Sequence, residues 1–263
     1  KIESNSWSEL QKSIVIDRLR FLESYSFKKA DFIIALTNAS KQELIAKFSI
    51  DSKNIEVIPT CVNNKYFYYD ENIRKSFRSK LGIDQDTSIF LYSGSIGGYY
   101  NFDEMINIFI ELKKIKQNSL FFVLSLVDRN FILNKFRSRN INESDFIIDS
   151  CNLEDVHKYL CMADIGLILY DDSYSSLARC PTKMGEYIKC NLKVLAPLNV
   201  GDLNNVFNLN KNIGVQFDDY SKVSYNKALN KIIKFSRDEK VENFSFFDLE
   251  DGVNKYHNVY ERF

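Results

Sequence analysis

From residue 72 onward, short apolar segments alternate with helical segments, and this alternation limits the possible folds more than any other feature. Strands are predicted at residues 88–93, 120–126, 146–148, 165–169, 193–196 and 214–217. These segments are mostly apolar and do not alternate between apolar and polar residues, which is typical of parallel strands covered by helices on both faces. The sequence therefore predicts an α/β fold with a doubly wound, Rossmann-like parallel sheet. Ligands of such sheets bind at the carboxyl ends of the strands.

Helices are predicted between these strands and on either side of them. The predicted helices of this region are 72–81, 102–116, 131–137, 153–162, 181–189, 203–208, one ending near Phe235 and one over 249–263. The first sixty residues predict a long helix over 1–30, a strand at 32–36, a helix from Ser40 to Phe48 and a strand at 55–58. Ser40 and Glu43 have the spacing of a capping box at the start of the second of these helices.

Composition excludes several classes of protein. Lys+Arg and Asp+Glu each total 35, so the chain lacks the basic balance of a general nucleic-acid binder. Five cysteines and two histidines form no CxxC pair or other metal-ligand spacing, which favours reduced thiols in a cytoplasmic protein. No apolar run approaches the roughly 20 residues that span a bilayer, and no signal peptide is visible. The sequence starts at Lys1 inside a predicted helix, so we expect a longer protein.

A glycine-rich turn follows the strand predicted at 88–93. The segment 92–100 reads YSGSIGGYY and holds three of the nine glycines. Glycines allow backbone N–H groups to approach a phosphate closely, and the next helix directs its positive end to the same place. The segment matches neither GxGxxG nor the P-loop, so the turn alone leaves phosphate binding and a simple chain reversal as alternatives.

A second candidate is the start of the helix predicted at 181–189. Pro181 suits a first helical turn, and Gly185 within the helix indicates a close approach by another group. Lys183 and Glu186 lie one turn apart on one face. The ammonium suits a diphosphate near the helix N-terminus, and the carboxylate suits the vicinal hydroxyls of a ribose. A solvated Lys–Glu pair is the structural alternative. The polar segment 171–176, directly after the strand predicted at 165–169, fits either a substrate contact or a helix cap or turn.

These segments together resemble the C-terminal half of a GT-B glycosyltransferase of the family 4 type. The most specific match is Pro181-Thr182-Lys183-Met184-Gly185-Glu186-Tyr187, followed by residues 193–196. Further similar segments, in chain order, are 30–37, 53–59, 62–67, 90–95 and 155–167. The resemblance divides the chain into a tail of the N-terminal acceptor domain (1–60), a linker (61–71), a nucleotide-sugar-binding domain (72–246) and a helix that packs back toward the N-terminal domain (247–263).

The resemblance implies roles for particular residues in binding a nucleotide sugar. Glu186 matches the glutamate that holds the ribose. Gly94, Ser95 and Gly97 would lie against the diphosphate, with Thr182 and Lys183 at the facing helix. Backbone at the strand ends would flank the base at Leu126, Val127, Cys151 and Asn152.

Two departures from the family pattern concern charge. A glutamate often found eight positions before the ribose glutamate is replaced by Ala178, and the usual loop cations are replaced by Ser95 and by residues 99–101. Arg179 and Lys183 are the cations that could compensate. The resemblance identifies no catalytic residue in this part of the chain.

The implied activity is transfer of a hexose from a nucleotide diphosphate sugar, with retention of configuration and no obligatory metal or cofactor. The acceptor, a glycan or lipid-linked sugar, would bind through the N-terminal domain, in surface polysaccharide or glycoconjugate synthesis. This places the enzyme in the cytoplasm and leaves open a peripheral association with the inner face of the membrane. The isolated chain is expected to be inactive. A non-catalytic nucleotide-binding or assembly module and a sugar-nucleotide epimerase are the alternatives.

Overall fold

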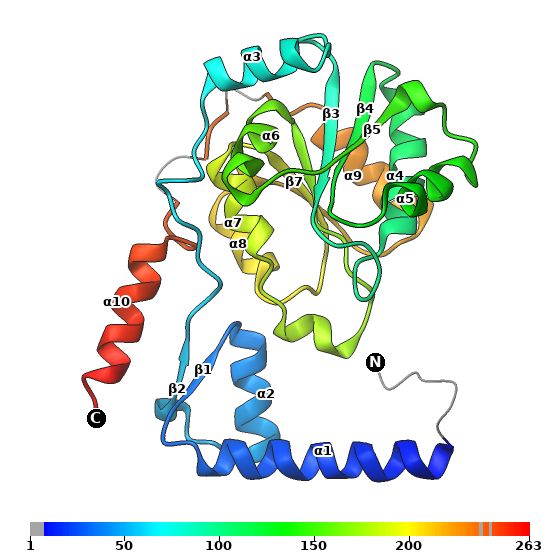
Figure 1. Ribbon diagram of the computed structural model, residues 1–263. Helices are drawn as coiled ribbons and strands as arrows, with labels where there is room; N and C mark the ends of the chain where they lie inside the picture. Colours follow the sequence, from blue (N-terminus) through cyan, green and yellow to red (C-terminus); the bar gives the residue numbers. More distant parts are fainter. Residues whose placement is uncertain (1–7, 237–238, 242–243) are drawn as a thin grey trace.

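The computed structural model describes residues 8–236, 239–241 and 244–263. Residues 1–7 of the helix predicted over 1–30 lie outside this description, as do four residues of the segment predicted at 72–246. The described part forms a large α/β domain and a smaller unit built from the first sixty residues (Figure 1). None of the described helices is both long enough and apolar enough to cross a membrane.

The large domain is built on a parallel sheet of six strands. The strands are β3 (Ser88–Ser93), β4 (Ser119–Leu124), β5 (Phe146–Asp149), β6 (Ile165–Leu167), β7 (Lys193–Pro197) and β8 (Gly214–Phe217). Their order across the sheet is β5-β4-β3-β6-β7-β8. After β5 the chain returns to the middle of the sheet, so the order reverses between β3 and β6. This is the doubly wound arrangement that the sequence predicts, and its ligands are expected beside that reversal.

Helices cover both faces of this sheet. They are α3 (Glu71–Lys80), α4 (Phe102–Ile115), α5 (Arg129–Arg137), α6 (Val156–Met162), α7 (Thr182–Lys189), α8 (Leu203–Leu209) and α9 (Lys222–Ile232). Short 3-10 turns occur at Ser52–Asn54 (η1), Glu143–Asp145 (η2), Leu153–Asp155 (η3), Tyr174–Ala178 (η4) and Lys211–Ile213 (η5). The helix predicted over 153–162 is therefore divided between η3 and α6.

The two faces of the sheet form two separate cores because side chains alternate along each strand. In β3, Ile89 and Leu91 contribute to the core beneath α3, α6, α7 and α8. Phe90 and Tyr92 of the same strand contribute to the core beneath α4, α5 and α9. Every residue of β3 is buried, which explains why the strand is apolar between its two terminal serines.

A buried ion-pair network fixes α3 to the sheet. The Asp164 carboxylate accepts hydrogen bonds from Arg74 at 2.6 Å, from Arg78 at 2.8 Å and from the backbone N–H of Ile89 at 2.8 Å. Arg78 is fully buried. Because two cations share one carboxylate and also donate to backbone carbonyls, their charges are compensated inside the domain.

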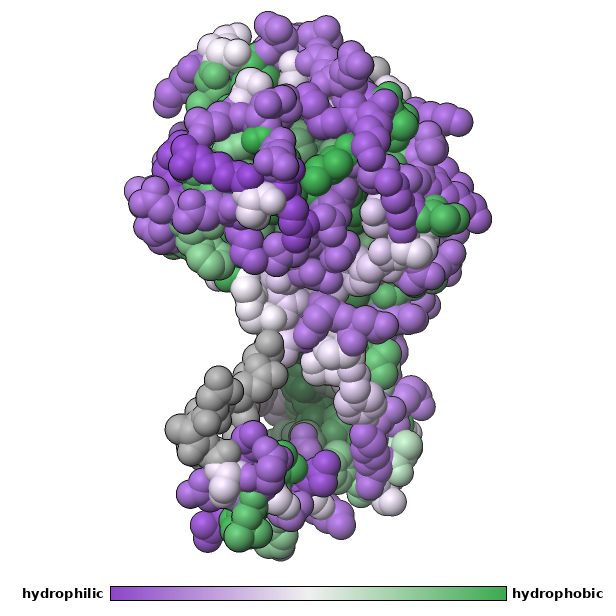
Figure 2. All heavy atoms as spheres, turned by 90° about the vertical axis from the view of Figure 1, so that its right-hand side faces the viewer, coloured by the Kyte–Doolittle hydropathy of each residue, from purple (hydrophilic) through white to green (hydrophobic). Residues whose placement is uncertain are grey.

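The smaller unit contains α1 (Glu9–Lys29), β1 (Ile33–Ala35), α2 (Asn38–Phe48) and β2 (Ile55–Val57). Strands β1 and β2 are parallel. The helix predicted to begin at Ser40 starts earlier, at Asn38, because Thr37 caps it and Ser40 supplies the reciprocal bond of the capping box. No residue of α1 is buried, and Leu10 and Phe21 are 71% and 67% exposed. Figure 2 shows hydrophobic side chains in a hollow at the waist between the two parts.

The C-terminal helix α10 (Leu249–Tyr260) runs from the large domain down to the smaller unit (Figure 1). At its start, Val62 donates to the Phe247 carbonyl at 2.7 Å, and Leu249 donates to the Val62 carbonyl at 3.1 Å. Beyond its end, the Arg262 guanidinium lies 5.0 Å from the centre of the Phe32 ring. The chain segment at 58–62 and α10 therefore connect the two parts side by side.

Candidate functional site

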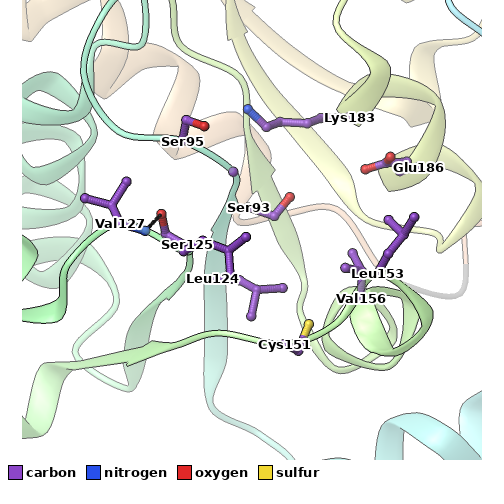
Figure 3. Close-up of a pocket in the computed structure, with 12 residues that line it drawn as sticks. Ser93, Ser95, Leu124, Ser125, Val127, Cys151, Leu153, Val156, Lys183 and Glu186 are labelled. Atoms are coloured by element: carbon purple, nitrogen blue, oxygen red, sulfur yellow. Dashed lines mark hydrogen bonds between the residues drawn. The ribbon is translucent and has the colours of Figure 1, made fainter.

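The main candidate site is a pocket of about 480 Å³ at the carboxyl edge of the sheet. It lies between the loops that follow β3, β4 and β5 on one side and α7 on the other, and therefore spans the reversal of strand order. Figure 3 shows Lys183 and Glu186 extending from α7 toward these loops. The volume is in the range of small-molecule sites. The pocket is lined by Ser93, Gly94, Ser95, Leu124, Ser125, Leu126, Val127, Cys151, Leu153, Val156, Lys183 and Glu186.

Gly94, directly after β3, has a backbone conformation that other residues rarely adopt. Its φ is +128°, and its N–H donates to the Leu124 carbonyl at 2.9 Å. A Cβ at this position would lie 2.7 Å from Cε and 2.8 Å from Nζ of Lys183. The glycine therefore allows the lysine side chain to rest directly on the loop.

Helix α7 directs Lys183 and Glu186 into the pocket and its apolar face into the core. Met184, Tyr187 and Ile188 are buried beneath it. Pro181 is the N-cap residue and not the first helical residue. A Cβ at Gly185 would lie 2.9 Å from Cβ of Phe247 and 3.0 Å from Cγ1 of Val62. The close approach expected at Gly185 is thus made by the connecting segments, on the side of the helix away from the pocket.

The Lys183 ammonium is largely withdrawn from water. Burial lowers its pKa to about 8, and the neighbouring Glu186 charge opposes this shift more weakly. The ammonium donates a 3.4 Å hydrogen bond to the Tyr92 hydroxyl. It is not within ion-pair distance of a carboxylate in the part of the chain that the structure describes. A buried cation without an anionic partner is well suited to receive a phosphate.

The Glu186 carboxylate lies one helical turn further along α7. Burial raises its pKa, and the Lys183 charge lowers it by a smaller amount. Within the described residues, the carboxylate accepts no hydrogen bond and forms no ion pair. Since buried acceptors are normally satisfied, a ligand with hydroxyl donors would complete the environment of Glu186.

The opposite end of the pocket is apolar. Leu126, after β4, and Leu153, in η3, are 87% and 78% exposed at its rim. Burial raises the pKa of the Cys151 thiol to about 11, so this group is neutral and acts as an apolar contact. Large exposed apolar side chains beside a cavity are suited to a flat, poorly hydrated ligand group such as a nucleobase.

The structure brings seven of the predicted residues together in the pocket lining, and four others do not line it. Gly94, Ser95, Leu126, Val127, Cys151, Lys183 and Glu186 all line the pocket. Gly97, Asn152, Thr182 and Arg179 are not among the lining residues. Sequence reasoning did not identify Ser93, Leu124 and Ser125, although they end the strands that carry predicted residues, nor did it identify Leu153 and Val156 in the following helical turn.

Arg179 is engaged outside the pocket. Its guanidinium donates to the Asp171 carboxylate at 2.7 Å and to the Ser175 hydroxyl at 2.9 Å. It also lies 4.3 Å from the centre of the Tyr99 ring. The segment 171–176 therefore binds Arg179, and this contact accounts for part of its polar sequence.

A second cavity of about 370 Å³ lies between the smaller unit and η4. It is lined by residues of α1, β1 and α2 and by Tyr174, Ser175, Leu177 and Ala178. Thr37 donates to the Leu177 carbonyl at 2.8 Å, which ties the start of α2 to this turn. Ala178 thus faces the smaller unit.

Among the described residues, no group of three or more His, Cys, Asp or Glu side chains is arranged to hold a metal ion.

The fold is that of the GT-B glycosyltransferases. A glycosyltransferase structure from Rickettsia africae aligns with a TM-score of 0.68 over 88% of this chain, at 16% identity. WaaG, a glycosyltransferase involved in lipopolysaccharide biosynthesis, aligns at 0.64 over 92%, with 20% identity. HepE from Anabaena, solved in complex with UDP-glucose, aligns at 0.72 over 94%, with 11% identity.

The present chain spans 63%, 64% and 68% of the lengths of these three structures, in the same order. No protein-family model and no curated protein matches the sequence.

Proposed function

We propose that this chain is the donor-binding part of a glycosyltransferase that uses a nucleotide diphosphate sugar. The observation that carries the proposal is the placement of Lys183 and Glu186 on one face of α7, opposite Gly94, at the reversal point of the sheet. Both charged groups are largely buried, and neither forms an ion pair among the described residues. A ligand with an anionic group would pair with the Lys183 ammonium, and vicinal hydroxyls on the same ligand would donate to the Glu186 carboxylate.

Each part of the donor has a corresponding part of the pocket. Glu186 accepts hydrogen bonds from the ribose hydroxyls. The Lys183 ammonium, the backbone N–H groups of the loop at Ser95 and the N-terminus of α7 hold the diphosphate. The apolar end at Leu126 and Leu153 takes the base. These assignments agree with the order base, ribose, diphosphate along a nucleotide sugar.

The chemistry that this arrangement supports is departure of the diphosphate from the sugar. Charge builds up on the phosphate oxygens as the sugar–oxygen bond breaks, and a preorganised cation lowers the energy of that state. Transfer of a hexose with retention of configuration, without a metal or cofactor, is the reaction we propose. No residue of this chain is assigned as the catalytic acid or base.

The acceptor is proposed to bind through a further domain. The exposed apolar side chains of α1 and the two-stranded sheet of the smaller unit are suited to packing against such a domain. A glycan or lipid-linked sugar acceptor, used in surface polysaccharide synthesis at the cytoplasmic face of the membrane, completes the proposal. By itself this chain is expected to transfer little or no sugar.

A non-catalytic nucleotide-binding module is the second candidate, and Ala178 favours it. This residue lines the cavity between the two parts and offers no carboxylate there. Both candidates bind a nucleotide at the same site, but only the transferase converts the nucleotide sugar.

Thermal-shift measurements with UDP, GDP and the corresponding nucleotide sugars test the proposed site. We expect one nucleoside diphosphate to raise the melting temperature, because a ligand that binds the native state adds RT ln(1 + [L]/Kd) to stability. A second assay uses a form of the protein that includes the proposed acceptor domain, together with a nucleotide sugar and a glycan acceptor. Release of the nucleoside diphosphate with transfer of the sugar identifies a transferase, and binding without release identifies a binding module. No shift with any nucleotide would remove both candidates.

A further inference from the structure

The Lys183 ammonium is held between the rings of two tyrosines. Its Nζ lies 3.9 Å from the centre of the Tyr100 ring and 4.7 Å from that of Tyr92. Aromatic faces carry partial negative charge, and they attract a cation most strongly where water is excluded. Lys183 forms no ion pair within the described residues, so these two ring faces act on its ammonium together with the Glu186 charge, which lies beyond ion-pair distance.

Tyr100 packs in turn against Tyr170. Its ring lies 5.2 Å from that of Tyr170 and 6.1 Å from that of Tyr92, measured between centres. Its backbone forms a bridge with Tyr170, and its N–H donates to the Gly97 carbonyl at 3.2 Å. The glycine loop is therefore folded against the chain that continues β6, and this contact sets the position of the Tyr100 ring.

A second cation, Arg179, contacts the ring of Tyr170. The Arg179 guanidinium lies 4.9 Å from the centre of the Tyr170 ring and is anchored by Asp171 at 2.7 Å. Arg179, Tyr170, Tyr100, Lys183 and Tyr92 thus follow one another in contact, and we refer to these five residues as the tyrosine–cation stack. The stack connects η4 with the pocket, although Arg179 does not line the pocket.

We propose that Tyr100 is a positioning residue for the phosphate-binding ammonium of Lys183. This inference rests on the proposed function, since it assumes that Lys183 contacts the diphosphate. A lysine side chain has several rotatable bonds, and holding it in one place before the ligand arrives reduces the entropy lost on binding. Tyr100 acts through Lys183 and has no contact of its own with the nucleotide.

A double-mutant cycle measured by calorimetric titration tests this role. The titrants are UDP and GDP, with uridine and guanosine as matched ligands that lack the diphosphate. We expect Tyr100→Leu or Tyr100→Met to weaken binding of the diphosphate about tenfold, and binding of the nucleoside by less than about twofold. Tyr100→Phe keeps the ring and should retain the affinity. In a Lys183→Met background, Tyr100→Leu should cause no further loss.

Three results would overturn the inference alone. Equal weakening of nucleoside and nucleoside diphosphate would show that Tyr100 shapes the whole pocket. An additive loss in the Lys183→Met background would show that Tyr100 acts independently of Lys183. Unchanged diphosphate affinity in Tyr100→Leu, with normal binding by the wild type, would remove the positioning role and leave the proposed function intact. Absence of diphosphate binding by the wild type would instead contradict the proposed function, and this inference with it.

Discussion

Nζ of Lys183 rests against the backbone of Gly94, so close that a Cβ on Gly94 would lie 2.8 Å from it. A helix that follows β6 and a loop that follows β3 therefore meet at one point above the sheet. That point is beside the reversal of strand order, where doubly wound sheets bind their ligands.

Gly94→Ala should therefore displace the ammonium and weaken nucleoside diphosphate binding by about tenfold or more, because the added methyl occupies the place of Cε and Nζ. Gly97→Ala is the matched control, since Gly97 also has a φ beyond the left-handed helical region, +94°, but a Cβ there would contact nothing within 4 Å. Both variants carry backbone strain, so a loss confined to Gly94→Ala assigns the effect to Lys183. Equal losses in calorimetric titration would refute that assignment.

Nucleoside diphosphate affinity should fall as the pH rises above about 8, because burial holds the pKa of Lys183 near that value and only the ammonium form attracts phosphate. The fall should approach about tenfold per pH unit. Calorimetric titrations from pH 7 to pH 9.5 measure it, with Lys183→Met as a control that keeps the side-chain length. An unchanged pH profile in Lys183→Met would assign the titration to another group.

The ligand-free protein should show the opposite trend in stability. The folded pKa of Lys183 lies below the ordinary lysine value of 10.5, so the unfolded chain binds more protons between about pH 8 and 10.5. The contribution of Lys183 to the free energy of unfolding should therefore increase with pH over this interval. Urea unfolding of wild type and Lys183→Met at pH 7 and pH 10 measures the difference, and a contribution that decreases with pH would contradict the burial of this charge.

Glu186→Ala should remove discrimination between ribose and deoxyribose. In the wild type, the 2′-deoxy form of the preferred nucleoside diphosphate should bind about tenfold to a hundredfold more weakly, since one hydrogen bond to a charged group is lost. In Glu186→Ala the ribo and deoxy forms should bind alike. Persistent discrimination in the variant would place the ribose elsewhere in the pocket.

Asp164→Ala should destabilise the fold by about 3–5 kcal/mol, because it leaves the Arg74 and Arg78 charges without their carboxylate. Asp155→Ala, which removes a half-exposed i,i+3 pair with Lys158, is the control and should cost less than about 1 kcal/mol. Chemical denaturation provides both values. A small effect at Asp164 would mean that water compensates the two guanidinium groups.

The parallel sheet and the pocket face of α7 could be predicted from sequence because both follow from local periodicity. Segments with an apolar centre such as Ser88–Ser93 indicate strands covered on both faces, and Lys183 and Glu186 share a helix face by their spacing. The carboxyl-edge rule then brings the segment around Gly94 near α7 without further information.

Features that depend on how loops fold could not be predicted in the same way. Arg179 was expected beside the diphosphate, but its position is determined by Asp171 and by the tyrosines of a loop some eighty residues earlier. The spacing of Tyr99 and Tyr100 carries no signal of their cation contacts. The α1 helix shows the same limit, because its apolar residues predict a helix but do not specify what covers it.

Calorimetric titration of the wild-type protein and of a Lys183→Met, Glu186→Ala double variant with UDP and with GDP tests the central claim most directly. We expect saturable binding of one of these nucleotides by the wild type, and no measurable binding by the double variant, whose melting temperature should not be lower by more than a few degrees. Binding that persists unchanged in the double variant, or its absence in the wild type, would contradict the assignment of this pocket to a nucleotide sugar.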